Sequence, residues 1–290
     1  MPATQGRKIA RVVIVAVIVL ALLALAAGPL LAASVTSIDR AATAAQPAER
    51  RDTIITATVC ESVAAAIARR HPGSTQQLVV RTVDWTDTVA AVQLANLTAG
   101  RWLCGREMTG RIGRTGFRPL LERRSGDGTA PAGVFPLATM TAWDGQRFSF
   151  FGNSPDPGVT AGTYRRVRTG DCFGATPNTS GYGHLRNDTR CAGADDEYLP
   201  DYVTSYTNAA LIGANTGPDV SGDAPGEIPY AAAIFLHRHV YVTPGATTGE
   251  TKPTSGCVSL SQTDLTSVLV DMRSDVLFVM GPTEWLLAAA

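Results

Sequence analysis

A cysteine and a histidine near the end of the chain have the order and spacing of a nucleophile and its base. Cys257 follows Gly256 at the start of the apolar segment Cys257–Leu260, and His237 ends the apolar stretch Ala233–Leu236. A cysteine nucleophile needs a base within hydrogen-bond reach and backbone N–H groups directed at the oxyanion that its attack creates. A histidine at a strand end can supply the base, and a Gly-Cys turn after a polar loop can supply the nucleophile and the N–H groups. The glycine lets the backbone approach a substrate closely, and the N–H of Cys257 is a natural oxyanion donor.

Two histidines compete for the role of base. His237 and His239 lie two residues apart, so on one strand both would point to the same face. Either imidazole would hold the thiol of Cys257 as a thiolate or take its proton during attack. No acidic residue is needed to orient the ring, because a backbone carbonyl can fix the tautomer. A zinc site made from these three side chains lacks a fourth ligand with suitable spacing, so we expect no metal and no other cofactor.

The cysteine count separates Cys257 from the other cysteines. The chain has five, and in an oxidising compartment an even set tends to pair while the odd one is a candidate reactive thiol. Cys172 and Cys191 flank a Gly/Asn/Thr-rich segment suited to a local disulfide. Cys60 and Cys104 would then tie the first helix to the sheet. Other connectivities remain open, and a buried apolar cysteine is the alternative for Cys257.

The N-terminal residues, 1–34, resemble a membrane-targeting segment. Basic residues, among them Arg7 and Lys8, precede the apolar run Val12–Ala33, which ends in small residues typical of a secretory signal. The run is also long enough, at about 20 residues, to span a bilayer. The basic residues on its amino side would keep that end cytoplasmic. We slightly favour a retained anchor over a cleaved signal, with residues 35–52 as a stalk, and in both cases the rest of the chain lies outside the membrane.

The remaining sequence predicts a mainly β domain over residues 76–290. Helical spacing over Ile54–Arg70, ended by a Pro-Gly pair, predicts within residues 53–75 a short helix packed on that domain. β-branched runs at Gln77–Val83 and Val89–Leu97 predict a hairpin. Further strands are expected at Trp102–Cys104, Thr109–Ile112, Tyr206–Asn215, Tyr230–Leu236 and Val276–Met280.

One further helix is expected after the cysteine. Ser261–Arg273 has helical spacing, with Ser261 as a candidate N-cap and Asp264 in the capping-box position. Val276–Met280 is expected to be the final strand, before Gly281-Pro282.

The charge balance excludes one class of partner. The chain carries 25 Lys and Arg residues against 25 Asp and Glu residues, so it has no basic surplus for nucleic acid. The acidic run Asp195–Glu197 predicts a solvated face, because adjacent acids do not place ligands around one metal.

Two segments resemble the catalytic domain of the L,D-transpeptidases, the YkuD-type cell-wall enzymes. The first is an apolar strand ending in His237, a loop, and the sequence Thr254–Cys257, in which a glycine precedes the cysteine. The second is Gly126–Leu137, which is similar to the family's Gly-Asp-Gly-x-Thr-Pro-x-Gly-x-Phe/Tyr segment that leads into a core strand. The resemblance covers roughly Gln77–Pro282 and is specific at these two segments.

The resemblance implies a mainly β fold, a β-sandwich of mixed sheets with one or two short helices, behind the N-terminal segment. It implies Cys257 as nucleophile, His237 as base, and the backbone of Gly256 and Cys257 as the oxyanion site. The implied reaction belongs to bacterial peptidoglycan synthesis and has stem peptides as partners. The cysteine attacks the third residue of a tetrapeptide stem, releases D-alanine, and passes the thioacyl group to an amine of a neighbouring stem, which forms a 3→3 cross-link.

Residues flanking the motif depart from the family pattern. Ser255 stands where the commonest motif has His, Ser259 where many members have Asn or Arg, and Arg238 where Ser or Gly is frequent. The Cys, Gly and His residues of the motif are therefore retained, whereas the residues expected to contact the substrate differ. Tyr230 and Arg238 are the candidates for these contacts.

Spacing and function also leave alternatives open. The interval from His237 to Cys257 is slightly longer than the commonest family spacing, and by spacing alone His239 would fit the role of base. If His237 is the base, His239 is expected to support it or to lie on the surface. The same residues would serve an L,D-carboxypeptidase or a transfer to a protein amine, and the altered flanks also fit a non-catalytic wall-binding protein.

Overall fold

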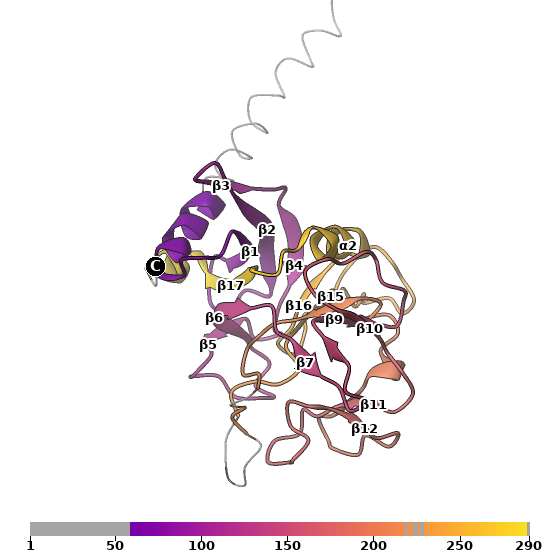
Figure 1. The fold of residues 1–290 in the computed structure, drawn as a ribbon. Coiled ribbons are helices and arrows are strands. Elements are labelled where there is room, and N and C mark those ends of the chain that lie inside the picture. The colour runs from indigo at the N-terminus through magenta and orange to yellow at the C-terminus, as the bar shows by residue number, and fades with distance from the viewer. Residues whose placement is uncertain (1–58, 218–219, 223–225, 227–228, 289–290) are drawn as a thin grey trace, which may run out of the picture. The chain divides into compact units, whose positions relative to one another are not determined.

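A computed structural model describes residues 59–217, 220–222, 226 and 229–288. The predicted mainly β class is confirmed: twelve strands form one large mixed sheet, and two small sheets lie beside it (Figure 1). In spatial order the large sheet contains β10 (Tyr164–Arg166), β9 (Phe150–Gly152), β14 (Ala209–Leu211), β15 (Phe235–Arg238), β16 (Val258–Leu260), β4 (Met108–Arg111), β2 (Val89–Thr98), β1 (Gln76–Thr82), β17 (Leu277–Pro282), β6 (Ala130–Pro136) and β5 (Phe117–Pro119), with β3 (Arg101–Cys104) paired to β2.

The small sheets and the helices complete the described part of the chain. One small sheet has the order β12 (Leu185–Asn187), β11 (Asp171–Phe173), β13 (Glu197–Tyr198), and the other pairs β7 (Met140–Thr141) with β8 (Arg147–Phe148). The helical elements are a helix over residues 59–70, α2 (Gln262–Asp271), α3 (Thr283–Ala288) and the 3-10 turn η1 (Leu199–Asp201).

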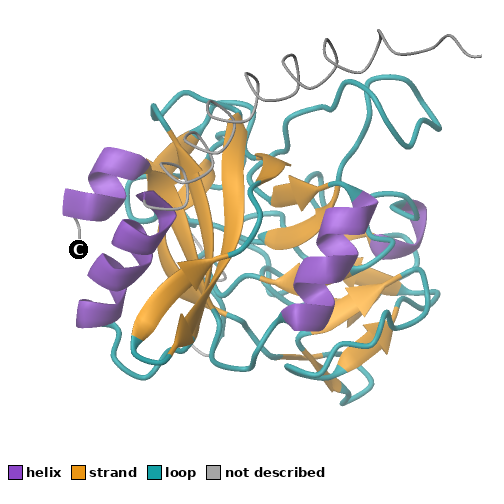
Figure 2. Ribbon diagram, turned by 90° about the horizontal axis from the view of Figure 1, so that it is seen from above, coloured by secondary structure: helices purple, strands orange, loops and turns teal. Residues whose placement is uncertain are grey.

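Two helices cover the part of the sheet formed by β1 and β17. Val63 and Ile67 of the helix over 59–70 pack with Val79 of β1, Val279 of β17 and Leu286 of α3. Figure 2 shows these two helices side by side along the sheet, with α2 at the opposite end of the domain. The helix predicted over Ile54–Arg70 is therefore found in its described part.

The helix predicted after the cysteine is confirmed, and a second helix near the end of the described residues was not predicted. Ser261 caps α2 as predicted, since its hydroxyl accepts a hydrogen bond from the backbone N–H of Asp264 at 3.1 Å. The sequence analysis missed α3 and so expected one or two helices, whereas the described residues contain three α-helices. Its six residues are too few to show helical periodicity.

Two predicted strands are shorter than expected. The strand predicted over Tyr230–Leu236 begins only at Phe235, because Ala233 takes a left-handed backbone conformation with φ of 52° that no strand accommodates. It extends past the predicted end to Arg238. The strand predicted over Tyr206–Asn215 is reduced to β14, Ala209–Leu211.

Parallel pairing of β15 with β16 sets the geometry of the candidate site. Leu236 lies opposite Val258 and His237 opposite Ser259. Leu236 and Val258 point into the main apolar core. Phe235 and Cys257 point to the other side, into a second cluster that includes Tyr206. Side chains alternate along a strand, so His237 lies on the same face as Cys257.

Both predicted disulfides are present. Cys60 is bonded to Cys104 and Cys172 to Cys191, while Cys257 is a free, buried thiol. Two structural disulfides indicate an oxidising, extracytoplasmic compartment. The apolar run Val12–Ala33, predicted to be an anchor or signal, lies outside the described residues. Within the residues that are described, no helix has the length and apolar character needed to cross a bilayer.

Candidate active site

The turn before β16 holds Cys257 in place. The Thr254 hydroxyl donates to the carbonyl oxygen of Cys257 at 2.7 Å and accepts from the N–H of Gly256 at 3.1 Å. One side chain thus fixes both ends of the Ser-Gly-Cys turn.

Gly256 is required by its conformation and by its neighbours. Its φ is +149°, a value that side-chain-bearing residues rarely adopt. A Cβ there would lie 2.9 Å from the carbonyl oxygen of Thr129 and 3.2 Å from Nη2 of Arg123. Thr129 belongs to Gly126–Leu137, so the two segments that carry the family resemblance meet directly at this glycine.

The Cys257 thiol is buried and protonated. The residue is 8 % exposed; Sγ donates to the carbonyl oxygen of Ala233 at 3.2 Å and accepts from the N–H of Phe235 at 3.4 Å. The left-handed conformation of Ala233 is part of the turn that presents this carbonyl. Burial, with the nearby charge of Glu197, raises the pKa of the Cys257 thiol to about 12. At neutral pH the resting sulfur is therefore a thiol.

The His237 ring is neutral, and its tautomer is fixed. Nδ1 lies 2.7 Å from the carbonyl oxygen of Arg238, which can only accept, so Nδ1 carries the proton and Nε2 keeps a lone pair. Burial lowers the pKa of His237 to about 4, although the hydrogen bond to Arg238 acts in the opposite direction. Among the described residues, no hydrogen bond joins His237 to Cys257; the sulfur instead bonds to backbone groups.

The ring of Tyr206 supports the His237 ring. Their centroids lie 5.5 Å apart in an edge-on arrangement, and Tyr206 makes a similar contact with Phe235 at 5.6 Å. The base predicted from the sequence thus lies on the cysteine face of the sheet, two positions along β15 from the residue that touches Sγ.

His239 points elsewhere. Its Nδ1 lies 2.9 Å from the hydroxyl of Ser259, and the residue lines a separate cavity with Tyr241 and Asp264. Backbone pairing continues past β15, because the N–H of His239 donates to the carbonyl oxygen of Leu260 at 2.7 Å. Ser259 lies opposite His237 in the register, on the Cys257 face, and its hydroxyl contacts His239. His237 is favoured as the base because it lies two positions along β15 from Phe235, whose N–H contacts the Cys257 sulfur, whereas His239 lines the other cavity.

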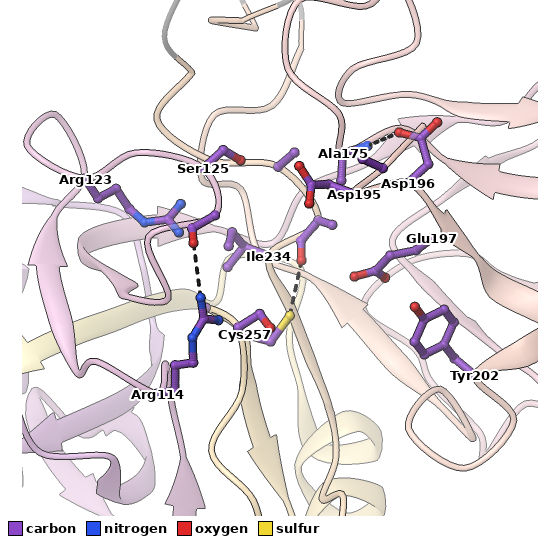
Figure 3. A pocket seen from close by; sticks show the side chains of 16 residues that line it. Arg114, Arg123, Ser125, Ala175, Asp195, Asp196, Glu197, Tyr202, Ile234 and Cys257 are labelled. Atoms are coloured by element: carbon purple, nitrogen blue, oxygen red, sulfur yellow. Dashed lines mark hydrogen bonds between the residues drawn. The ribbon is translucent and has the colours of Figure 1, made fainter. Parts of the chain in front are cut away.

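A cavity of about 320 Å³ opens beside Cys257 (Figure 3). Arg114 and Arg123 lie in one wall, Glu197 and Tyr202 in the other, and Cys257 between them. This volume is at the lower end of the range for small-ligand sites. The two walls carry opposite charges, so the cavity suits a ligand with both kinds of polar group.

Arg123 was not predicted from the sequence. It is 2 % exposed, and its guanidinium donates to the carbonyl oxygens of Tyr230 at 2.6 Å and Thr129 at 2.9 Å. Asp127 lies 3.8 Å away and balances the charge. Thr129 and Asp127 belong to the loop that follows this arginine, but Tyr230 comes from a distant segment, and no sequence pattern indicates that the side chain is buried beside Cys257.

Glu197 was also missed, and the prediction of a solvated acidic face was wrong. The Asp196 side chain is 3 % exposed and accepts from the backbone N–H groups of Ala175 and Thr176 at 3.0 and 2.9 Å. Glu197 accepts a hydrogen bond from the Tyr206 hydroxyl, and burial raises the pKa of its carboxyl to about 7. Only Asp195 of the three is exposed.

The other residues predicted to lie at the site, Ser255, Tyr230 and Arg238, take different positions in the structure. Ser255 is exposed and lines the cavity. Tyr230 contributes its carbonyl to Arg123, while its ring lies under the guanidinium of Arg124. Arg238 contributes its carbonyl to the tautomer of His237. The two candidate substrate contacts thus act through their backbone in this structure.

Comparison of the chain with protein-family models, with curated proteins and with solved structures finds no match. The resemblance to L,D-transpeptidases therefore rests on the sequence motifs.

A metal centre is not assembled from the predicted residues. His237, His239 and Cys257 do not converge, because His239 lines a different cavity. Among the described residues, Cys172, Cys191 and Asp196 do lie close enough to hold an ion. Both cysteines are in a disulfide, however, and supply no thiolate.

Proposed function

We propose that this protein is a cysteine acyltransferase that acts as a peptidoglycan L,D-transpeptidase. The observation that carries the proposal is a free thiol at the Gly256–Cys257 turn, in a cavity of about 320 Å³, on the same sheet face as a histidine with an unprotonated Nε2. Nucleophile, base and a backbone turn suited to an oxyanion are the parts that acyl transfer requires.

The resting protonation states select one route for the first step. A thiolate–imidazolium pair is disfavoured, because the thiol pKa lies near 12 and the imidazole pKa near 4. Cys257 therefore leaves its bond to Ala233, and Nε2 of His237 takes the thiol proton as sulfur attacks the carbonyl carbon. The C–N bond to D-alanine breaks, the proton passes from His237 to the departing amine, and a thioester remains on Cys257.

The setting proposed for this reaction is the cell wall. The fold would be a variant of the family's β-sandwich, and Val12–Ala33 would hold the domain outside the membrane or direct its export. Arg123, in one wall of the cavity, would contact polar groups of the stem peptide.

Product analysis tests the proposal. The full-length chain is incubated with a tetrapeptide stem, and D-alanine and peptide products are quantified by liquid chromatography and mass spectrometry. We expect D-alanine and a 3→3 dimer, and neither from Cys257→Ala. A tripeptide with no dimer would indicate a carboxypeptidase instead. Absence of D-alanine, from a folded protein with a free thiol, would refute acyl transfer on this substrate.

A further inference from the structure

Glu197 faces Cys257 across the cavity without being part of the nucleophile–base pair. Figure 3 shows its carboxylate directed into the cavity, towards the Cys257 sulfur. Backbone pairing of β13 with β11, in which Glu197 lies opposite Phe173, holds it there. The disulfide from Cys172 to Cys191 ties the same small sheet to its loop.

Tyr206 connects this carboxyl with the base. Its hydroxyl donates to Oε2 of Glu197, and its ring packs against the His237 ring. The ring of Tyr202 lies 5.4 Å from that of Tyr206 in the same wall. Oε2 is thereby occupied, while the second oxygen of Glu197 faces the cavity.

The position of Glu197 suits the second half of the reaction better than the first. Facing it are Tyr202, Tyr206 and Cys257, with Arg123 in the opposite wall. A negative charge there opposes formation of a thiolate and adds to burial, the larger cause, in raising the pKa of Cys257. Once Cys257 carries a neutral acyl group this opposition ends, and the carboxylate is free to attract a cation.

An acceptor amine must lose a proton before it can attack the thioester. A primary amine at neutral pH is an ammonium ion and has no lone pair for attack. His237 already has a task in this step, since the departing Cys257 sulfur must recover a proton. A second base is therefore needed, and among the neighbouring acids Asp196 is held by Ala175, Thr176 and Arg186.

We propose that Glu197 is the base for the acyl acceptor, a catalytic residue that binds the acceptor's ammonium group and removes its extra proton. This proposal rests on the acyltransferase function proposed above. The ammonium gives one proton to Glu197, and the nitrogen lone pair attacks the thioester carbon. As the C–N bond forms and the C–S bond breaks, a second proton passes from nitrogen through Nε2 of His237 to Sγ. The products are an amide, the Cys257 thiol and a protonated Glu197, which loses its proton to water.

The test separates acylation from transfer in the full-length protein. Glu197→Gln keeps the shape of the side chain and can still accept the Tyr206 hydrogen bond, and Asp201→Asn removes an exposed acid from η1 as a matched control. Acylation is followed by the Cys257 adduct and one equivalent of D-alanine. Transfer is then started with methylamine, an ammonium ion at pH 7, or with hydroxylamine, which is already neutral.

We expect Glu197→Gln to acylate as well as the parent or faster. Its transfer to methylamine should fall by about 100-fold, the lower range for loss of a general base, whereas transfer to hydroxylamine should be unchanged. The control should match the parent throughout. Equal loss with both amines, or loss with neither, would overturn the role of Glu197. Failure of the parent to acylate would instead overturn the proposed function.

A second measurement needs no variant. In the parent, transfer to methylamine should be nearly independent of pH above about 7, where Glu197 is ionised and takes the ammonium proton, and should decline below that pH. Loss of the proton to water alone would instead make the rate change by about tenfold for each pH unit on both sides of pH 7. Transfer to hydroxylamine, a much weaker base, should show no such change of slope at that pH. Parallel profiles for the two amines would contradict the proposal even if Glu197→Gln failed to fold.

Discussion

At the scale of single residues, burial decides how Cys257 can react. Both the thiol and the His237 imidazole are held in their neutral forms, with pKa values near 12 and 4. A pre-formed thiolate, as found where a cysteine lies beside a cation or a helix N-terminus, has no support here. In the proposed reaction the thiol is instead activated at the moment of attack, which would keep it inert towards other electrophiles.

Alkylation of the resting protein tests this protonation state. The iodoacetamide rate at Cys257 should be slower than that of a free cysteine at pH 7, since the raised pKa leaves less thiolate. It should rise by about tenfold for each pH unit up to about pH 10, because the thiolate fraction grows by that factor below the pKa. The measurement is intact mass against time.

Glu197→Gln provides the internal comparison for that experiment. Removing the negative charge lowers the pKa of the Cys257 thiol, so alkylation at pH 8 should be faster than in the parent. At pH 5, below the pKa of about 7, Glu197 is already neutral in the parent and the two rates should agree. A rate plateau between about pH 5 and 8 in the parent would instead reveal a thiolate–imidazolium pair.

At the scale of elements, the site is the junction of two sheets. β15 and β16 of the large sheet supply His237 and Cys257, and β13 of the small sheet supplies Glu197. Few backbone pairs hold β13 in the small sheet: Cys172 of β11 pairs with Tyr198, and Phe173 pairs with Glu197. We infer that the disulfide from Cys172 to Cys191 keeps this short-stranded wall in register.

Removing each disulfide should separate stability from activity. The loop closed by Cys172 and Cys191 spans 19 residues, and that closed by Cys60 and Cys104 spans 44. Chain-entropy arguments predict a loss of about 3–4 kcal/mol in the free energy of unfolding for each double Cys→Ser variant, measured by urea denaturation.

Of the two double variants, only the one that lacks the Cys172–Cys191 disulfide should affect the reaction. Loss of the Cys172–Cys191 bond loosens the wall that carries Glu197, so transfer to an acceptor amine should slow while the fold persists. The variant lacking Cys60–Cys104, which ties the helix over 59–70 to β3, should acylate and transfer like the parent at temperatures where it is folded. Equal activity in both variants would refute a role for this disulfide in the site.

At the scale of the whole molecule, the sequence predicts what depends on local patterns. β-branched runs at Gln77–Val83 and Val89–Leu97 correspond to β1 and β2, and the N-cap Ser261 follows from its chemistry. The odd number of cysteines indicated that one, Cys257, is free. The pairing of the other four could be inferred because Cys172 and Cys191 flank a segment suited to a local disulfide.

What the sequence did not predict depends on contacts between distant segments. Arg123 is held in the site partly by the carbonyl of Tyr230, and Glu197 by pairing of two short strands. Choosing between His237 and His239 requires knowing their neighbours, which are the Tyr206 ring for His237 and the Ser259 hydroxyl for His239. None of these features has a periodicity or a motif, because each is fixed by tertiary packing.

The central claim is that Cys257 becomes acylated, and intact mass spectrometry tests it most directly. The full-length protein is mixed with a tetrapeptide stem and sampled before an acceptor amine is added, with Cys257→Ala in parallel. We predict a mass increase equal to one tripeptidyl acyl group on the parent, located at Cys257 by peptide mapping, and none on the variant. An unmodified parent, with folded structure and one titratable thiol, or the same adduct on Cys257→Ala, would contradict the claim.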